Sequence, residues 1–89
     1  MRAYQHFKSN PEHDVDGNPQ RYYAVYELVE QGDDYQDYWK LVEIYDEGFG
    51  GRPTVLRGIP ALPNVTISVH TYRIVLQQAE ATGILKYGE

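Results

Sequence analysis

The amino-acid sequence predicts an α+β fold, a small antiparallel sheet of three to four strands with one C-terminal helix packed on one face. Two neighbouring runs, residues 21–30 and 35–46, alternate their side chains with the period of strands and are expected to form a long central hairpin. Residues 47–64 contain four glycines and three prolines, which exclude a long regular element there. Residues 68–82 have the spacing of an amphipathic helix. A chain of 89 residues has room for one domain, which we place over residues 1–89.

The first part of the chain is predicted as strand, loop and strand. Residues 1–8 mix aromatic and polar side chains and are predicted as a strand. Residues 9–20 are predicted as a loop, because proline, glycine, aspartate and asparagine recur there as turn signals. Strand alternation in residues 21–30 places Tyr22, Ala24, Tyr26 and Leu28 on one face and Tyr23, Val25, Glu27 and Val29 on the other.

Residues 35–46 follow a turn at residues 31–34 and admit two interpretations. As a strand, the run places Tyr38, Val42 and Ile44 on one face and Trp39, Leu41 and Tyr45 on the other. As an amphipathic helix, it places Tyr38, Leu41, Val42 and Tyr45 on one stripe. The strand is favoured because aromatic and β-branched residues are abundant, and because Asp46 would lie at the negative end of a helix dipole.

The C-terminal third is predicted as a short strand followed by the helix. Residues 54–57 are expected to form the short strand between glycines and prolines. Ser68 is placed to cap the helix of residues 68–82, and Gly83 to end it. Residues 65–67 are all β-branched, so they either extend towards the helix or form its first turn. Residues 84–89 are expected to form a tail that packs on the sheet.

Composition excludes several classes of protein. The chain has no cysteine, which excludes disulfide scaffolds, thiol nucleophiles and cysteine-bound metal centres. No apolar run approaches the ~18 residues of a membrane-spanning helix. The first residues lack the apolar segment of a signal peptide. We therefore expect a cytoplasmic protein that does not bind membranes.

Negative charge is concentrated in the central hairpin. Eight carboxylates and one lysine between Glu27 and Glu47 give this stretch a formal charge of −7, whereas the whole chain carries −5. Such a field repels phosphate backbones and attracts basic partners. We therefore expect that the protein does not bind nucleic acid directly. Its expected partner is a protein with a basic surface.

No catalytic, metal or cofactor site is predicted. His6, His13 and His70 lie in three different segments without a shared ligand spacing. Residues 12–18 resemble the beginning of an EF-hand calcium loop, but the position of its bidentate glutamate is occupied by Tyr23. We therefore expect a non-enzymatic protein without a metal or cofactor.

Aromatic residues are the most prominent feature of the hairpin. Of the nine tyrosines, six lie between residues 22 and 45, together with the only tryptophan. These rings either close the small core or form a recognition surface, which we favour because a single helix covers only one face of the hairpin. The residues predicted to contact the partner are Tyr26, Glu30, Asp33, Asp34, Tyr35, Asp37, Tyr38, Trp39 and Tyr45.

Three functions are compatible with this pattern. The leading hypothesis is a small acidic protein-binding module, in one concrete version a phage-type or mobile-element inhibitor that docks its hairpin on a basic surface of a nucleic-acid-handling protein. The first alternative is a structural or assembly subunit that self-associates, for example as a homodimer, through the same aromatic residues. The second is a small ligand-binding or enzymatic domain, whose pocket would be lined by His70, Tyr72, Arg73, Arg52 and Arg57.

Overall fold

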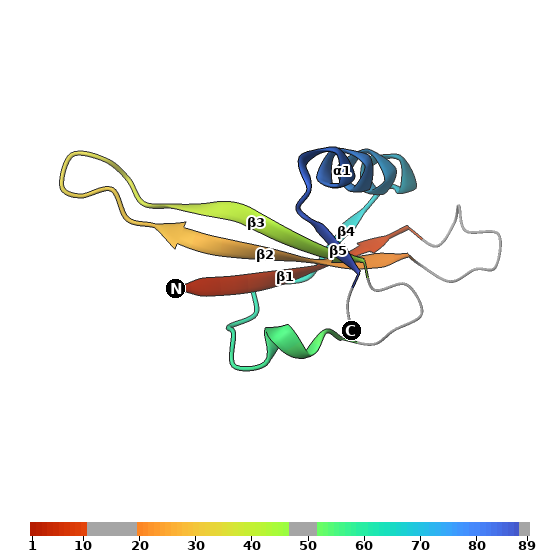
Figure 1. Ribbon diagram of the computed structural model, residues 1–89, viewed down its shortest axis with the longest axis horizontal. Helices are drawn as coiled ribbons and strands as arrows, with labels where there is room; N and C mark the ends of the chain where they lie inside the picture. Colours follow the sequence, from red (N-terminus) through yellow and green to blue (C-terminus); the bar gives the residue numbers. More distant parts are fainter. Residues whose placement is uncertain (11–19, 47–51, 88–89) are drawn as a thin grey trace.

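A computed structural model describes residues 1–10, 20–46 and 52–87, which fold into a five-stranded mixed sheet with one helix on one face (Figure 1). The elements in chain order are β1 (Arg2–Ser9), β2 (Arg21–Val29), β3 (Tyr38–Asp46), the 3₁₀ helix η2 (Thr54–Leu56), β4 (Val65–Ile67), α1 (Val69–Thr82) and β5 (Leu85–Tyr87). The predicted α+β class is confirmed, with five strands in place of three to four. The two further strands, β4 and β5, are three residues long, too short to show a reliable alternation.

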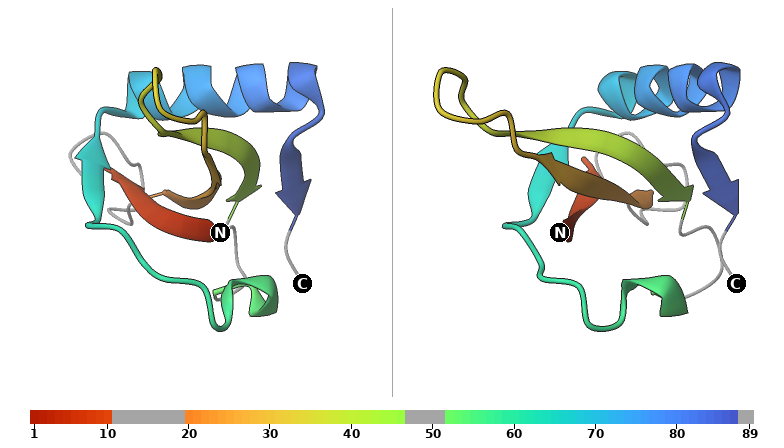
Figure 2. Two further views of the ribbon diagram at one scale, coloured as in Figure 1. Left: turned by 90° about the vertical axis from the view of Figure 1, so that its left-hand side faces the viewer. Right: turned by 60° about the vertical axis from the view of Figure 1, so that its left-hand side comes forward.

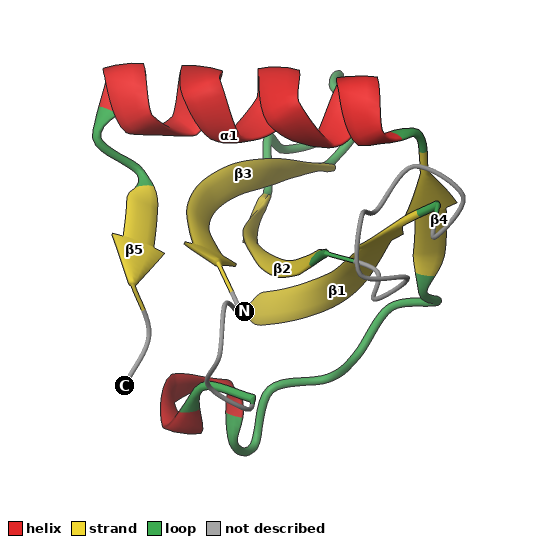
Figure 3. Cartoon of the chain, turned by 90° about the vertical axis from the view of Figure 1, so that its right-hand side faces the viewer, coloured by secondary structure: helices red, strands yellow, loops and turns green. Residues whose placement is uncertain are grey.

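The three long strands lie side by side, and two short strands joined by a crossover connection flank them. β1, β2 and β3 form an antiparallel meander, and the short strands pair in parallel at its two edges, β4 with β1 and β5 with β3. Because β1 and β3 run in the same direction, β4 and β5 also do. Helix α1 connects them across one face of the sheet (Figure 3). The strand interpretation of the run that became β3 is thereby confirmed.

The helix begins and ends at the predicted residues. The Ser68 hydroxyl accepts a hydrogen bond from the backbone N–H of Thr71 at 3.1 Å, which satisfies a donor of the first turn. Gly83 adopts φ +80°, a left-handed conformation that glycine reaches without strain. Residues before the cap are extended as β4, and the chain after Gly83 returns to the sheet as β5.

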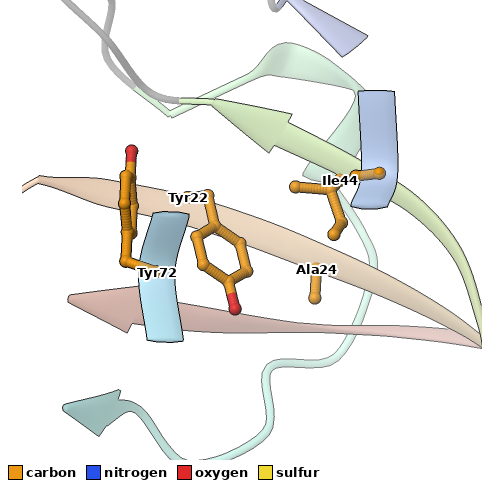
Figure 4. Packing of buried hydrophobic residues seen from close by; sticks show 5 residues of the cluster. Tyr22, Ala24, Ile44 and Tyr72 are labelled. Carbon is orange, nitrogen blue, oxygen red and sulfur yellow. The ribbon is translucent and has the colours of Figure 1, made fainter. Parts of the chain in front are cut away.

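One part of the core lies between the sheet and α1. Tyr22, Ala24 and Ile44 from the sheet pack against Tyr72 and Ala79 from the helix (Figure 4). The ring of Tyr22 stacks on Phe7, with centroids 4.8 Å apart. This face is the one to which the alternation of β2 assigned Tyr22 and Ala24.

The opposite face of the sheet is covered by the segment that contains η2 (Figure 2). Leu56 is fully buried there against Tyr4, Tyr23 and Val25. The prediction of a strand over residues 54–57 is wrong, because this segment crosses the face of the sheet and lies along neither edge. Its backbone forms local bonds instead, such as Arg57 N–H to the Thr54 carbonyl at 3.1 Å.

A bulge in β3 changes the predicted distribution of its side chains. Across from Val25, the ladder shifts so that Val42 is an extra residue beside Glu43. Val42 and Tyr45 therefore pack with the Leu56 side of the core, while Ile44 packs with the helix side. The predicted grouping of Val42 with Ile44 is wrong, because simple alternation cannot anticipate an inserted residue.

We expect the Leu56→Ala variant to lose about 2–5 kcal/mol of unfolding free energy, since it empties a fully buried site at the centre of one face. Val55→Ala is the matched control, because the neighbouring Val55 side chain is 46% exposed. Urea unfolding followed by circular dichroism measures both. Equal losses in the two variants would contradict the assignment of Leu56 as the residue that closes this face.

We also expect the free energy of unfolding to fall at alkaline pH because Tyr22 ionises. Burial, with a smaller contribution from Tyr26, raises the pKa of Tyr22 from 10.0 to about 12. The folded state therefore favours the neutral ring, which adds to the free energy of unfolding. This contribution is fully present below about pH 10 and is lost as the pH rises through about 12. Between these pH values the wild type should lose more unfolding free energy than Tyr22→Phe. A difference between the two proteins that stays constant over this range would contradict the prediction.

Candidate functional site

The β2–β3 hairpin extends beyond the rest of the molecule. The molecule measures 50 × 25 × 25 Å, and the long dimension follows this hairpin (Figure 1). At the inner end both faces are covered, whereas α1 does not reach the outer end. We call residues 26–41 the distal hairpin. The face opposite the helix is expected to remain partly exposed, and it does so only at the outer end, because the η2 segment covers its inner end. Exposure therefore changes along the length of the hairpin.

The helix side of the distal hairpin carries an apolar patch. Tyr26 opposes Leu41 and Leu28 opposes Trp39 in the antiparallel ladder, so these four side chains share a face. It is the face of Ala24 and Ile44, continued outward beyond α1. The Trp39 and Leu41 side chains are 39% and 37% exposed, and Tyr26 and Leu28 are half-buried. We call Tyr26, Leu28, Trp39 and Leu41 the apolar patch.

The other side of the distal hairpin is more polar. Tyr38 opposes Val29 there, and Lys40 opposes Glu27. Arg2 approaches two carboxylates on this side, Glu27 at 3.7 Å and Glu43 at 3.9 Å. Such partly exposed ion pairs contribute little to stability. Their effect is to neutralise part of the charge near the base of the hairpin and to leave the outer end acidic.

The turn at the end of the hairpin concentrates negative charge. Gly32 has φ +89°, and the side chain of Asp37 closes the turn by accepting a hydrogen bond from the Gln31 N–H at 3.2 Å. Every residue from 30 to 40 is exposed. The carboxylates at this end are Glu30, Asp33, Asp34 and Asp37. Together they place a negative field at the outer border of the apolar patch.

Most of the residues predicted to contact a partner do lie on the distal hairpin, but Tyr45 does not. It packs with the Leu56 side of the core, and its hydroxyl donates to Glu43 Oε2 at 2.7 Å. Burial and then the Glu43 carboxylate raise the pKa of Tyr45 to about 12, against an opposing effect of Arg2. Tyr26 lies at the inner border of the patch, where burial raises its pKa and its hydroxyl donates to Gln5 at 3.3 Å.

Sequence reasoning missed Leu28 and Leu41 as members of the surface. Leu28 alternates with Tyr26 along β2, which is a signal that the sequence does contain. The position of Leu41 depends on the bulge, because without it Leu41 would lie on the face opposite Ile44. The same bulge decides that Trp39 lies on the helix side and Tyr38 on the other. The two aromatic residues are neighbours in β3 and therefore lie on opposite faces, as the alternation predicts.

The residues proposed for a small-molecule pocket are not brought together. Tyr72 belongs to α1 and packs on one face of the sheet, whereas Leu56, beside Arg57, packs on the opposite face. Figure 2 shows α1 and η2 on these opposite faces. Among residues 1–10, 20–46 and 52–87, no three histidine or acidic side chains converge as metal ligands. The EF-hand-like segment of residues 12–18 and His13 lie outside the described residues.

Comparison of the chain with protein-family models, with curated proteins and with solved structures finds no match. In the described part of the chain, no helix has the length and apolar character needed to span a membrane. The distal hairpin is therefore interpreted from its own chemistry.

The field around the apolar patch can be measured with the only tryptophan of the chain. At low salt we expect the ratio of caesium to iodide quenching of Trp39 fluorescence to exceed the ratio for free N-acetyltryptophanamide, because the turn carboxylates attract cations and repel anions. The triple variant Asp33→Asn, Asp34→Asn, Asp37→Asn should reduce this preference. Glu80→Gln, which removes an exposed charge on α1, is the control and should leave it unchanged. A wild-type ratio equal to or below that of the free compound would contradict the acidic border.

Proposed function

We propose that this protein is a binding module whose distal hairpin docks on a basic surface of another protein. The observation that carries the proposal is an apolar patch with exposed Trp39 and Leu41, left uncovered by α1 and bordered by the turn carboxylates. A patch of this kind resembles the centre of a protein interface, where aromatic residues predominate and charges lie at the rim.

The two parts of the surface would contribute differently to binding. Tryptophan is among the residues that most often dominate interface energetics, because its large ring loses much contact with water and little conformational freedom. The exposed carboxylates would accelerate encounter with a basic partner and select against acidic ones. Affinity is therefore expected to depend mainly on the patch, and the salt dependence of binding on the turn.

One concrete form of this function is inhibition of a nucleic-acid-handling protein, as a phage-type or mobile-element inhibitor does. In such a pair, the carboxylates of the turn would occupy a groove that otherwise holds phosphates. Two features support this form of the function. The turn is acidic, and the distal hairpin projects from the rest of the molecule as a narrow element that fits a groove.

Self-association is the second candidate, and the exposure of Trp39 and Leu41 is the observation that favours it. Two copies joined through this hairpin would bring two acidic surfaces near each other, at a chain charge of −5 each. Like charges oppose such a contact, especially at low salt. A basic partner removes this cost and is the better supported occupant.

Selection of a random peptide library on the immobilised protein at low salt tests the proposal. We expect peptides that combine Lys or Arg with apolar residues to be enriched. The same triple aspartate-to-asparagine variant should bind them about tenfold more weakly at low salt, with a smaller dependence on salt, since each rim charge contributes modestly. Glu80→Gln should bind them as the wild type does. Failure to enrich basic peptides, or equal binding by the triple variant, would contradict the proposal.

A further inference from the structure

The outer edge of β3 is covered over only part of its length. β5 pairs with Ile44–Asp46, and within the described chain no strand lies along the rest of that edge, residues 38–43. We propose, on the basis of the proposed function, that this open edge takes up an extended strand from the basic partner. The hairpin would then bind by continuing its sheet into the partner, a mode in which backbone hydrogen bonds provide affinity.

The direction of the backbone groups at this edge follows from a hydrogen bond on the opposite side of β2. The Leu28 N–H donates to the Met1 carbonyl at 2.9 Å and so points away from β3. Opposed residues of an antiparallel ladder either exchange both hydrogen bonds or neither. Trp39, which opposes Leu28, therefore directs its N–H and C=O outward. Leu41 opposes Tyr26, two residues along from Leu28, and has the same orientation.

The part of the edge already in use shows the same pattern. The Ile44 N–H donates outward to the Ile84 carbonyl at 2.9 Å, where the chain enters β5. Beyond the bulge, Leu41 and Trp39 continue this series of outward groups. The protein therefore binds one strand at this edge already, and the next positions along it are Leu41 and Trp39.

Trp39 and Leu41 also supply the exposed side chains of the apolar patch. A strand added beside them would place every second side chain on the helix side, next to these two residues, where apolar groups pair best. Its backbone and its apolar side chains would thus engage the same two residues. This coincidence favours an extended segment over a helix laid across the patch, because a helix would leave the outward groups of the edge unused.

The two ends of the open edge define the chemistry of the added strand. At the inner end, the bulge at Val42 and Glu43 interrupts regular pairing, so the strand would pair with residues 38–41. At the outer end it would reach Asp37 and the exposed carboxylates of the turn. The occupant is therefore a short extended segment of the partner, with apolar residues at alternate positions and Lys or Arg at the end near the turn.

A comparison of Leu41→Pro with Leu41→Ala tests this mode of binding. Both variants lose the leucine side chain, but only proline also removes the outward N–H, and it is tolerated on edge strands where the N–H faces outward. With the peptides selected on the wild type, we expect Leu41→Pro to bind about tenfold more weakly than Leu41→Ala, the loss of about one interface hydrogen bond. Thermal unfolding by circular dichroism verifies that both variants are folded.

Peptides methylated at single backbone nitrogens provide a second measurement on the unaltered protein. Strand addition predicts that methylation at alternate positions abolishes binding and that the positions between them tolerate it. Equal affinity of Leu41→Pro and Leu41→Ala, or tolerance of methylation at every position, would overturn edge binding while leaving the proposed docking function intact. If the wild type enriches no basic peptide, the docking function itself fails. A wild-type dimer in sedimentation without peptide, abolished by Leu41→Pro, would assign the edge to a second copy and overturn the proposal.

Discussion

The reach of the β4–α1–β5 crossover determines which part of this sheet can be buried. One helix of 14 residues connects the two edges and lies across the inner end of the meander. β2 and β3 are nine residues each and continue past it. A sheet surface is removed from water only where another element covers it. The outer end of the hairpin is therefore exposed on both faces, because α1 crosses the strands only at the inner end and the η2 segment covers the second face only there.

The same constraint explains why a small chain can use so many tyrosines. At the inner end, tyrosines serve as core residues on both faces, with Tyr22 under the helix and Tyr23 under η2. Their rings fill space that a short chain cannot fill with many separate residues, and a hydroxyl at the border, such as that of Tyr45, still finds a polar partner. At the outer end, Tyr35 and Tyr38 have no such cover. One residue type thus has two roles, separated along the hairpin.

Charge and apolar surface are combined at the outer end in a way that suits binding better than stability. The carboxylates of the turn repel each other and are exposed, so they add little to the folded state. They do surround the end of the edge at which Trp39 and Leu41 present both side chains and backbone groups. The bulge at Val42 has a part in this arrangement, because it turns Trp39 and Leu41 to the helix side and marks where regular pairing with β5 ends.

Local patterns in the sequence determined most of the secondary structure, because they depend on neighbouring residues. Alternation specified β2, and the Ser68 cap with Gly83 specified α1. The acidic turn was also visible, since charge can be counted along a chain. The face of each residue in β3 was decided only by the tertiary structure, because one bulge reverses the alternation. The role of residues 54–57 was decided there too, since a segment with strand-like residues became the cover of one sheet face around Leu56. Whether an aromatic residue lies in the core or on the surface depends on which element covers it, and that is a property of the assembled fold.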